Sequence, residues 1–249
     1  MKTIIRKIGA ASPVFAAVLS IGSAVAAPAD YVFTPSVEYG EREIDFKSGT
    51  VKRSGEDRES AASIGFGYGA TQYWFTELYL KYKRENGGGT FHDAVEWENK
   101  FQLTQPGQYP VDIGFITEIE RPRDHSEGYE FKFGPLFQTE FGKTQLNFNV
   151  LFQRYYRAAQ ANTMTSGYQW QTKYRLKPQF EFGLQGFGEL GQWNRIAPRA
   201  EQSHLLGPAV FGKIALGGRN AVKYNAAYLI DASDTKHSNT FRAQVEYEF

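Results

Sequence analysis

Charged residues occur at alternate positions in several segments of this chain. Between residues 77 and 83, Glu77, Lys81 and Lys83 fall on one parity, while Leu78 and Leu80 fall on the other. Because alternate residues of a β-strand point to opposite faces of its sheet, such a segment has one charged and one apolar face. Opposite charges attract across neighbouring strands, and ionised groups away from bulk water need such partners. The charged face could therefore select charged solutes or neutralise itself.

The same parity rule predicts which charged residues point into a shared interior. The candidate pore-lining residues are Glu77, Lys81, Lys83, Glu96, Glu98, Lys100, Asp112, Glu118, Glu120, Glu130, Lys132, Lys173, Arg175, Glu181, Lys213, Lys223, Arg242 and Glu246. When Glu38, Glu140, Glu189 and Glu248 are added, acidic residues outnumber basic ones. An open interior would therefore have a weak preference for cations.

Hairpin parity also allows specific cross-strand ion pairs. The expected pairs are Lys83 with Glu96, Lys81 with Glu98, Glu118 with Lys132, Arg175 with Glu181, and Lys223 with Glu246. A fully paired lining would only fill the interior, so a narrow passage and a filled barrel both remain open.

Histidine and serine positions give little support for an enzyme. A hydrolytic site built on these residue types would need a serine and a histidine on the same face of a strand. Ser203 and His204 are adjacent, so in a regular strand they point to opposite faces. No histidine has a serine two positions away, and no His-x-His or His-x-x-x-His spacing exists. We therefore predict no catalytic residues, no metal site and no cofactor.

The elements that must position these residues are strands. Twelve segments show the two-residue period: residues 31–40, 62–68, 74–82, 95–103, 111–119, 129–141, 146–152, 168–176, 180–190, 206–216, 222–230 and 239–249. Short connections alternate with longer polar loops at residues 41–59, 84–92, 121–128, 157–166, 193–202 and 231–238. This rhythm predicts an all-β fold, a transmembrane antiparallel up-and-down β-barrel of twelve strands with both termini in the periplasm.

The N-terminus has the pattern of an export signal. Lys2, Arg6 and Lys7 precede an apolar stretch, and small residues then offer cleavage between Ala26 and Asp30. We expect residues 1–27 to be a signal peptide and residues 28–249 to form one barrel domain.

Composition excludes several classes of protein. Without the three basic residues of the signal, 25 of the 28 lysines and arginines remain, against 27 acidic residues. The remaining chain has no excess of basic residues, so nothing indicates nucleic-acid binding. No stretch after the signal approaches the roughly 20 apolar residues of a spanning helix. The absence of cysteine excludes disulfides and a lipoprotein anchor. A barrel remains compatible with the low mean hydropathy, because its two faces cancel in the average.

The last segment carries a more specific signal. Phe241, Val245, Tyr247 and Phe249 alternate with charged and polar residues, and the chain ends on the aromatic ring. This pattern resembles the closing strand of Gram-negative outer-membrane barrels. In architecture the whole chain is similar to small monomeric twelve-stranded porins, the oligogalacturonate-specific porins and the nucleoside channels. Unlike the acidic-sugar porins, it lacks opposed tracks of arginine and lysine.

The resemblance implies a location and a set of partners. The location is the outer membrane, with lipids and lipopolysaccharide around a barrel that is expected to be a monomer. During biogenesis, periplasmic chaperones and the barrel-assembly machinery would handle the chain, with Tyr247 and Phe249 as the assembly signal. The predicted function is a porin-like channel for passive diffusion of small hydrophilic solutes. The alternatives are a structural or accessory barrel with a side-chain-filled lumen and, third, a lipid hydrolase.

Overall fold

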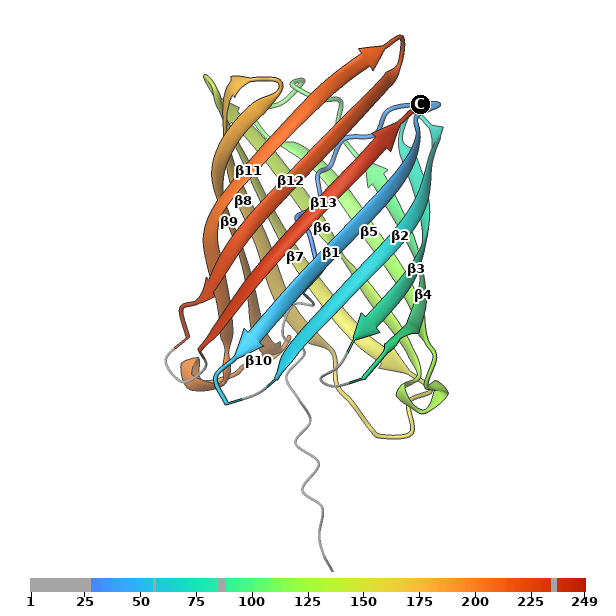
Figure 1. Ribbon diagram of the computed structural model, residues 1–249, viewed down its shortest axis with the longest axis vertical. Coiled ribbons are helices and arrows are strands. Elements are labelled where there is room, and N and C mark those ends of the chain that lie inside the picture. Colours follow the sequence, from blue (N-terminus) through green and yellow to red (C-terminus); the bar gives the residue numbers. More distant parts are fainter. Residues whose placement is uncertain (1–27, 56, 85–87, 234–236) are drawn as a thin grey trace, which may run out of the picture.

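The computed structural model describes residues 28–55, 57–84, 88–233 and 237–249, which form one closed barrel (Figure 1). The expected signal peptide, residues 1–27, lies outside the described residues. Within the described residues, the long strands are β1 (Arg42–Arg53), β2 (Arg58–Thr71), β3 (Trp74–Arg84), β4 (Thr90–Gln102), β5 (Asp112–Pro122), β6 (Tyr129–Phe141), β7 (Thr144–Tyr156), β8 (Thr165–Lys177), β9 (Phe180–Gln192), β11 (Ser203–Gly217), β12 (Asn220–Asp231) and β13 (Ser238–Glu248).

Each long strand pairs with its neighbours in antiparallel register, and β1 closes the barrel against β13. A two-residue strand, β10 (Arg195–Ile196), pairs antiparallel with the end of β9, and two short 3₁₀ turns, η1 (His125–Glu127) and η2 (Arg199–Glu201), lie in loops. No helix in the described part of the chain is long and apolar enough to cross a membrane. The predicted all-β class and the twelve-stranded antiparallel barrel are confirmed.

The prediction for the first strand was wrong. Residues 31–40 are not a strand, and β1 occupies most of the segment 41–59 that was expected to be a loop. Ser48, Gly49 and Thr50 interrupt the alternation of apolar and polar residues in β1, so its strand pattern is weak. Ile44 and Phe46 nevertheless keep its outer face apolar. The count of twelve survives because one strand was missed and one was wrongly assigned.

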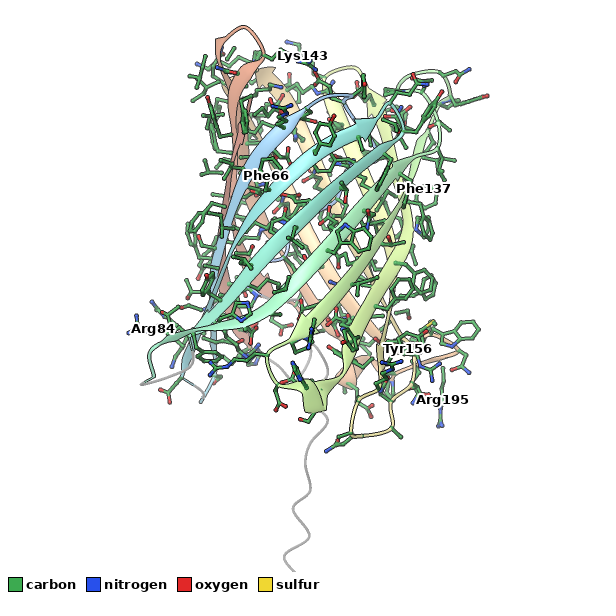
Figure 2. All side chains as sticks on the ribbon, turned by 90° about the vertical axis from the view of Figure 1, so that its right-hand side faces the viewer. Phe66, Arg84, Phe137, Lys143, Tyr156 and Arg195 are labelled. Carbon is green, nitrogen blue, oxygen red and sulfur yellow. The ribbon has the colours of Figure 1, made fainter. Side chains whose placement is uncertain are left out.

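The two ends of the barrel differ. Short turns join most of the strands at the end that carries the C-terminus and Lys143, which we call the turn end (Figures 1 and 2); the exception is the longer connection 103–111 between β4 and β5. Longer connections, η1, η2 and β10 lie at the opposite loop end, near Arg84, Tyr156 and Arg195 (Figure 2). At the turn end Gly142 has φ 58°, a left-handed conformation that the tight turn between β6 and β7 requires.

The outer wall is apolar along the barrel. Phe66 and Phe137 project from it in Figure 2, and the side chain of Phe66 is 53% exposed. Such a surface of exposed aromatic and aliphatic side chains is typical of a lipid-facing band.

Residues 28–41, which we call the inner segment, run inside the barrel (Figure 1). The amide of Val37 donates to Gln102 Oε1 at 2.8 Å, and Gly40 and Glu41 exchange backbone hydrogen bonds with Gly69. A Cβ at Gly69 would lie 2.0 Å from the carbonyl oxygen of Glu38, so glycine is needed for this close approach. The segment is therefore fitted to the wall.

Candidate functional site in the barrel lumen

Three consecutive residues of the inner segment cross the lumen. Phe33 packs against one apolar cluster of the wall, formed by Ile116, Leu136 and Leu151. Val32 packs against another, formed by Phe187, Leu205, Ala209, Phe211, Ala227 and Leu229. The hydroxyl of Tyr31 donates a hydrogen bond to Glu98 at 2.7 Å. Because these contacts reach different strands, residues 31–33 form a septum across the barrel.

The septum separates two cavities. The loop-end cavity has a volume of about 250 Å³, and the turn-end cavity a volume of about 710 Å³. Among the described residues, only Tyr31 and Phe33 line both. The rings of Tyr31 and Phe33 therefore lie at the boundary between the two cavities.

Carboxylates follow two adjacent rows of paired residues across the wall. One row contains Glu248, Glu43, Gly67, Glu77, Glu98, Glu118 and Lys132. The next contains Lys223, Glu246, Asp45, Gly65, Tyr79, Glu96, Glu120 and Glu130. Because barrel strands are tilted, such rows climb along the axis. We call the acidic residues of both rows the carboxylate track; it passes from the turn-end cavity to the loop-end cavity.

Lysines neutralise the two ends of the carboxylate track. At the turn end Lys223 lies 2.6 Å from Glu246 and also contacts Glu248. Towards the loop end, Lys132 lies 2.7 Å from Glu118.

Lys81 adds a further pair near the loop end, since its Nζ lies 2.9 Å from Glu96 and also contacts Glu120. In the middle of the track, no ion pair joins Glu43, Glu77 or Glu98 to a lysine or arginine among the residues described. The carboxyl groups beside the septum therefore lack the direct lysine partners found at both ends of the track.

Lys47 lies in this central region. Its Nζ is 3.5 Å from the ring centroid of Tyr31, 3.6 Å from that of Tyr79 and 3.4 Å from Asp45 Oδ2. Tyr79 and Gln244 both donate hydrogen bonds to the same carboxylate oxygen, at 2.8 and 2.9 Å. Sequence reasoning missed Lys47 because the segment that contains β1 was assigned to a loop. The inward parity of Glu43, Asp45 and Lys47 was the signal that could have found it.

The opposite wall, on β6 to β9, carries amides. It is formed by Gln138, Gln145, Asn147, Asn149, Gln169, Gln171 and Gln185. They bond to one another, for example from Asn147 to Gln138 at 2.9 Å and from Gln185 to Gln171 at 3.1 Å. Asn149 also donates to the carbonyl of Phe33 and so fixes the septum. Only charges were considered in the sequence, so this uncharged half of the lining was missed.

Two predicted ion pairs are confirmed, Glu118 with Lys132 and Lys223 with Glu246. The other three were wrong. Lys81 contacts Glu96 instead of Glu98, and Lys83 contacts Glu59 instead of Glu96. The register of β3 with β4 explains both differences, because Glu98 faces Glu77 and Glu96 faces Tyr79, so neither lysine lies opposite its expected partner. A further shift between Lys81 and Tyr82 displaces Lys83 as well.

Arg175 contacts Glu140 at 2.7 Å, while Lys173 lies 3.7 Å from Glu181, the partner expected for Arg175. Arg175 lies beside a register shift between Tyr174 and Lys177 in the pairing of β8 with β9, so its facing residues also differ from a regular ladder.

The remaining predicted residues take different positions. Lys100 lies over the ring of Phe75, and the guanidinium of Arg242 lies 5.0 Å from the ring of Phe187. Asp112 accepts a hydrogen bond from the amide of Gly107 in the connection before β5.

Lys213 pairs with Glu248 at 2.7 Å. Tyr247 and Phe249 stack on the outer surface, with ring centroids 5.6 Å apart. The pore-lining and assembly roles of these residues stay predictions.

Glu41, at the turn end of the inner segment, has a carboxyl group with a raised pKa. Burial raises the pKa of its carboxyl to about 7, and the hydrogen bond with Glu248 acts in the same direction, while Lys223 at 3.3 Å lowers it. Its charge therefore changes near neutral pH.

His204 has partners at both ring nitrogens. Nδ1 lies 2.8 Å from the hydroxyl of Tyr168, and Nε2 lies 2.8 Å from Gln202 Oε1. Its backbone amide donates to the hydroxyl of Ser233. The hydrogen bonds of the ring thus go to a tyrosine and an amide, and neither is the serine that a hydrolase pair requires.

Two groups of carboxylates have the proximity that a metal ion needs. Their oxygens lie within 4.8 Å of one another in Glu41, Glu43 and Glu246, and in Glu96, Glu98 and Glu118. Lys223 contacts the first group, and Lys81 and Lys132 contact the second. Ammonium groups therefore already supply positive charge at both places.

Comparisons with known proteins identify the fold. No family model and no curated protein sequence matches the chain. The NanC porin structure is 12% identical, with a TM-score of 0.55 over 81% of this chain and 98% of that chain. The COG4313 outer membrane channel from Pseudomonas putida F1 is 10% identical, with a TM-score of 0.55 over 88% and 98%. The protein has the fold of an outer-membrane β-barrel.

Proposed function

We propose that the protein is an outer-membrane channel for small hydrophilic solutes, with a preference for cations. The observation that carries this proposal is the pair of polar cavities that follow one another inside the barrel beside the carboxylate track. Solutes of one charge are concentrated in a passage lined by the opposite charge. The turn-end cavity has an excess of carboxylates over lysines and arginines, which favours cations.

The short turns and longer loops support an orientation. Bacterial outer-membrane barrels have short periplasmic turns and longer external loops. In this proposal the turn end faces the periplasm, the loop end faces the outside, and the apolar wall contacts outer-membrane lipids and lipopolysaccharide. Tyr247 and Phe249 would then serve assembly from the periplasmic side.

Planar-bilayer recording tests the channel. The refolded protein should give discrete single-channel currents, and a KCl gradient should give a reversal potential of the sign expected for cation preference. Clear anion preference would overturn the selectivity. A silent protein, together with no swelling of liposomes in small sugars, would overturn the channel itself.

The septum favours one second candidate, a structural barrel with a filled lumen. Phe33, Val32 and Tyr31 together close the cross-section through packed contacts. In that case wild type carries no current, and variants of the septum that keep the barrel folded carry none either.

A further inference from the structure

We propose that the central layer of the lumen is a recognition site for primary ammonium groups, and that Lys47 occupies it in the resting barrel. This proposal rests on the channel function, because it names the class of solute that the passage selects. The solutes are small organic amines that are protonated at neutral pH, above all diamines.

The surroundings of the Lys47 ammonium are those of a cation site. It lies between the faces of two tyrosine rings, Tyr31 and Tyr79, with Asp45 at 3.4 Å. Aromatic faces attract cations most strongly where water is excluded, and aromatic cages bind ammonium ligands in this way. Lys47, Asp45 and Tyr79 are all buried. The lysine therefore stands where the ammonium of a solute would bind.

The layer offers more acceptors than Lys47 uses. Asp45 Oδ1 and Glu77 Oε1 are buried and have no hydrogen-bond donor among the described residues. Glu77 faces Glu98 across β3 and β4, and neither forms an ion pair there. A primary ammonium has three donors and no acceptor, so it complements such a site. Carboxylates that accept N–H bonds favour a primary ammonium over a quaternary one, which has no N–H to donate.

Glycine on β2 makes room for this arrangement. A Cβ at Gly65 would lie 2.4 Å from the ring of Tyr79 and 2.6 Å from Glu77 Oε1. The missing side chain lets both groups fold against the wall beside Asp45, which pairs with Gly65. Gly65 of β2 therefore leaves a space in the wall, and side chains of β1 and β3 occupy it.

The site is reachable from both cavities. Lys47 lines the loop-end cavity, whereas Asp45, Glu77 and Tyr79 line the turn-end cavity. Tyr31 lines both and belongs to the septum. An ammonium group that enters from either side can therefore compete with Lys47 for the same rings and carboxylates.

Calorimetry on the folded full-length barrel in detergent tests the site. The probes are 1,4-diaminobutane, the neutral 1,4-butanediol and the dianion succinate. Lys47→Met vacates the site and should bind diaminobutane about tenfold more tightly than wild type, because the tethered competitor is gone. Adding Asp45→Asn to that variant should abolish the gain. Lys143→Met removes an ammonium at an exposed turn and should behave as wild type.

Equal diaminobutane affinity in Lys47→Met and wild type would overturn the proposal, and so would equal binding of butanediol. Heat-modifiable mobility on gels reports whether each variant is folded. If Lys47→Met does not fold, Tyr31→Leu serves instead, because it removes one ring of the site from the inner segment and leaves every strand intact. It should weaken diaminobutane binding about tenfold, and unchanged binding would count against the site.

Liposome swelling separates this proposal from the channel function. Diaminobutane should enter faster than butanediol in wild type, and Asp45→Asn should reduce the difference. If no solute enters but calorimetry gives the expected order, the channel fails and the ammonium site stands. If both solutes enter equally and calorimetry shows no preference, the channel stands and the ammonium site fails.

Discussion

At the residue scale, charge in the lumen is organised by position along the carboxylate track. Glu118 and Glu246, towards its two ends, each have a lysine within 2.7 Å. Glu77, in the middle, has no such partner among the described residues. The carboxyl groups without a lysine partner thus lie beside the septum, where an entering cation could supply the missing partner.

In the proposed channel, Glu41 should make the ion selectivity depend on pH. Because burial raises the pKa of its carboxyl to about 7, the group is mostly neutral below that pH and charged above it. Raising the pH from about 6 to about 8 should add negative charge to the turn-end cavity and increase the cation preference. Reversal potentials measured at both pH values check this. Glu41→Gln should reduce the shift, whereas Glu38→Gln, at an exposed position, should keep it in full; the same shift in both would contradict this assignment.

At the scale of elements, the inner segment and the wall have separate tasks. The pairings that close the barrel join β1 to β13 and involve no residue of the segment. The segment supplies the septum, and glycines of β1 and β2 let it approach, as at Gly49, where a Cβ would lie 1.9 Å from the carbonyl oxygen of Pro28. The wall therefore should fold without the septum.

Removal of residues 31–39 should open the lumen. We expect the barrel to fold and its single-channel conductance to rise about twofold or more, since the narrowest point of a pore dominates its resistance. Bilayer recording checks this, with Tyr39→Ala, a change at an exposed residue of the same segment, as the control. Unchanged conductance after the deletion would show that the septum is not the constriction.

At the scale of the whole molecule, the stability of the barrel should depend on contact between its apolar outer wall and lipid. Ile64 lies in the middle of β2, is 46% exposed and is flanked across the sheet by Phe46 and Leu80. Ile64→Lys should destabilise the barrel in lipid vesicles by about 2–4 kcal/mol, because a charge at the bilayer midplane loses its hydration.

Urea unfolding in vesicles measures this cost. Ile64→Leu, which keeps the position apolar, should cost much less. Equal stability of the lysine and leucine variants would show that this face does not meet lipid.

Much of the strand pattern of this barrel follows from the sequence alone, because it depends on residues that are close together in the chain. Strand parity depends on neighbouring residues, so alternation determined which face of most strands is apolar and where most turns fall, whereas the count of twelve was right because two errors cancelled. It also found most charged residues of the lumen, and it failed for β1, where small polar residues weaken the alternation.

Only the tertiary structure decided how these residues meet. The bond from Tyr31 to Glu98 joins residues 67 positions apart, and that from Gln244 to Asp45 spans 199 positions. The register of β3 with β4 and the closure of β1 on β13 set which carboxylates pair and which stay unpaired. The sequence by itself determined the wall and its two faces. The septum depends on strands that come together only when the barrel closes, and Lys47 lies between two rings only because Tyr31 of the inner segment folds back over β1 and β3.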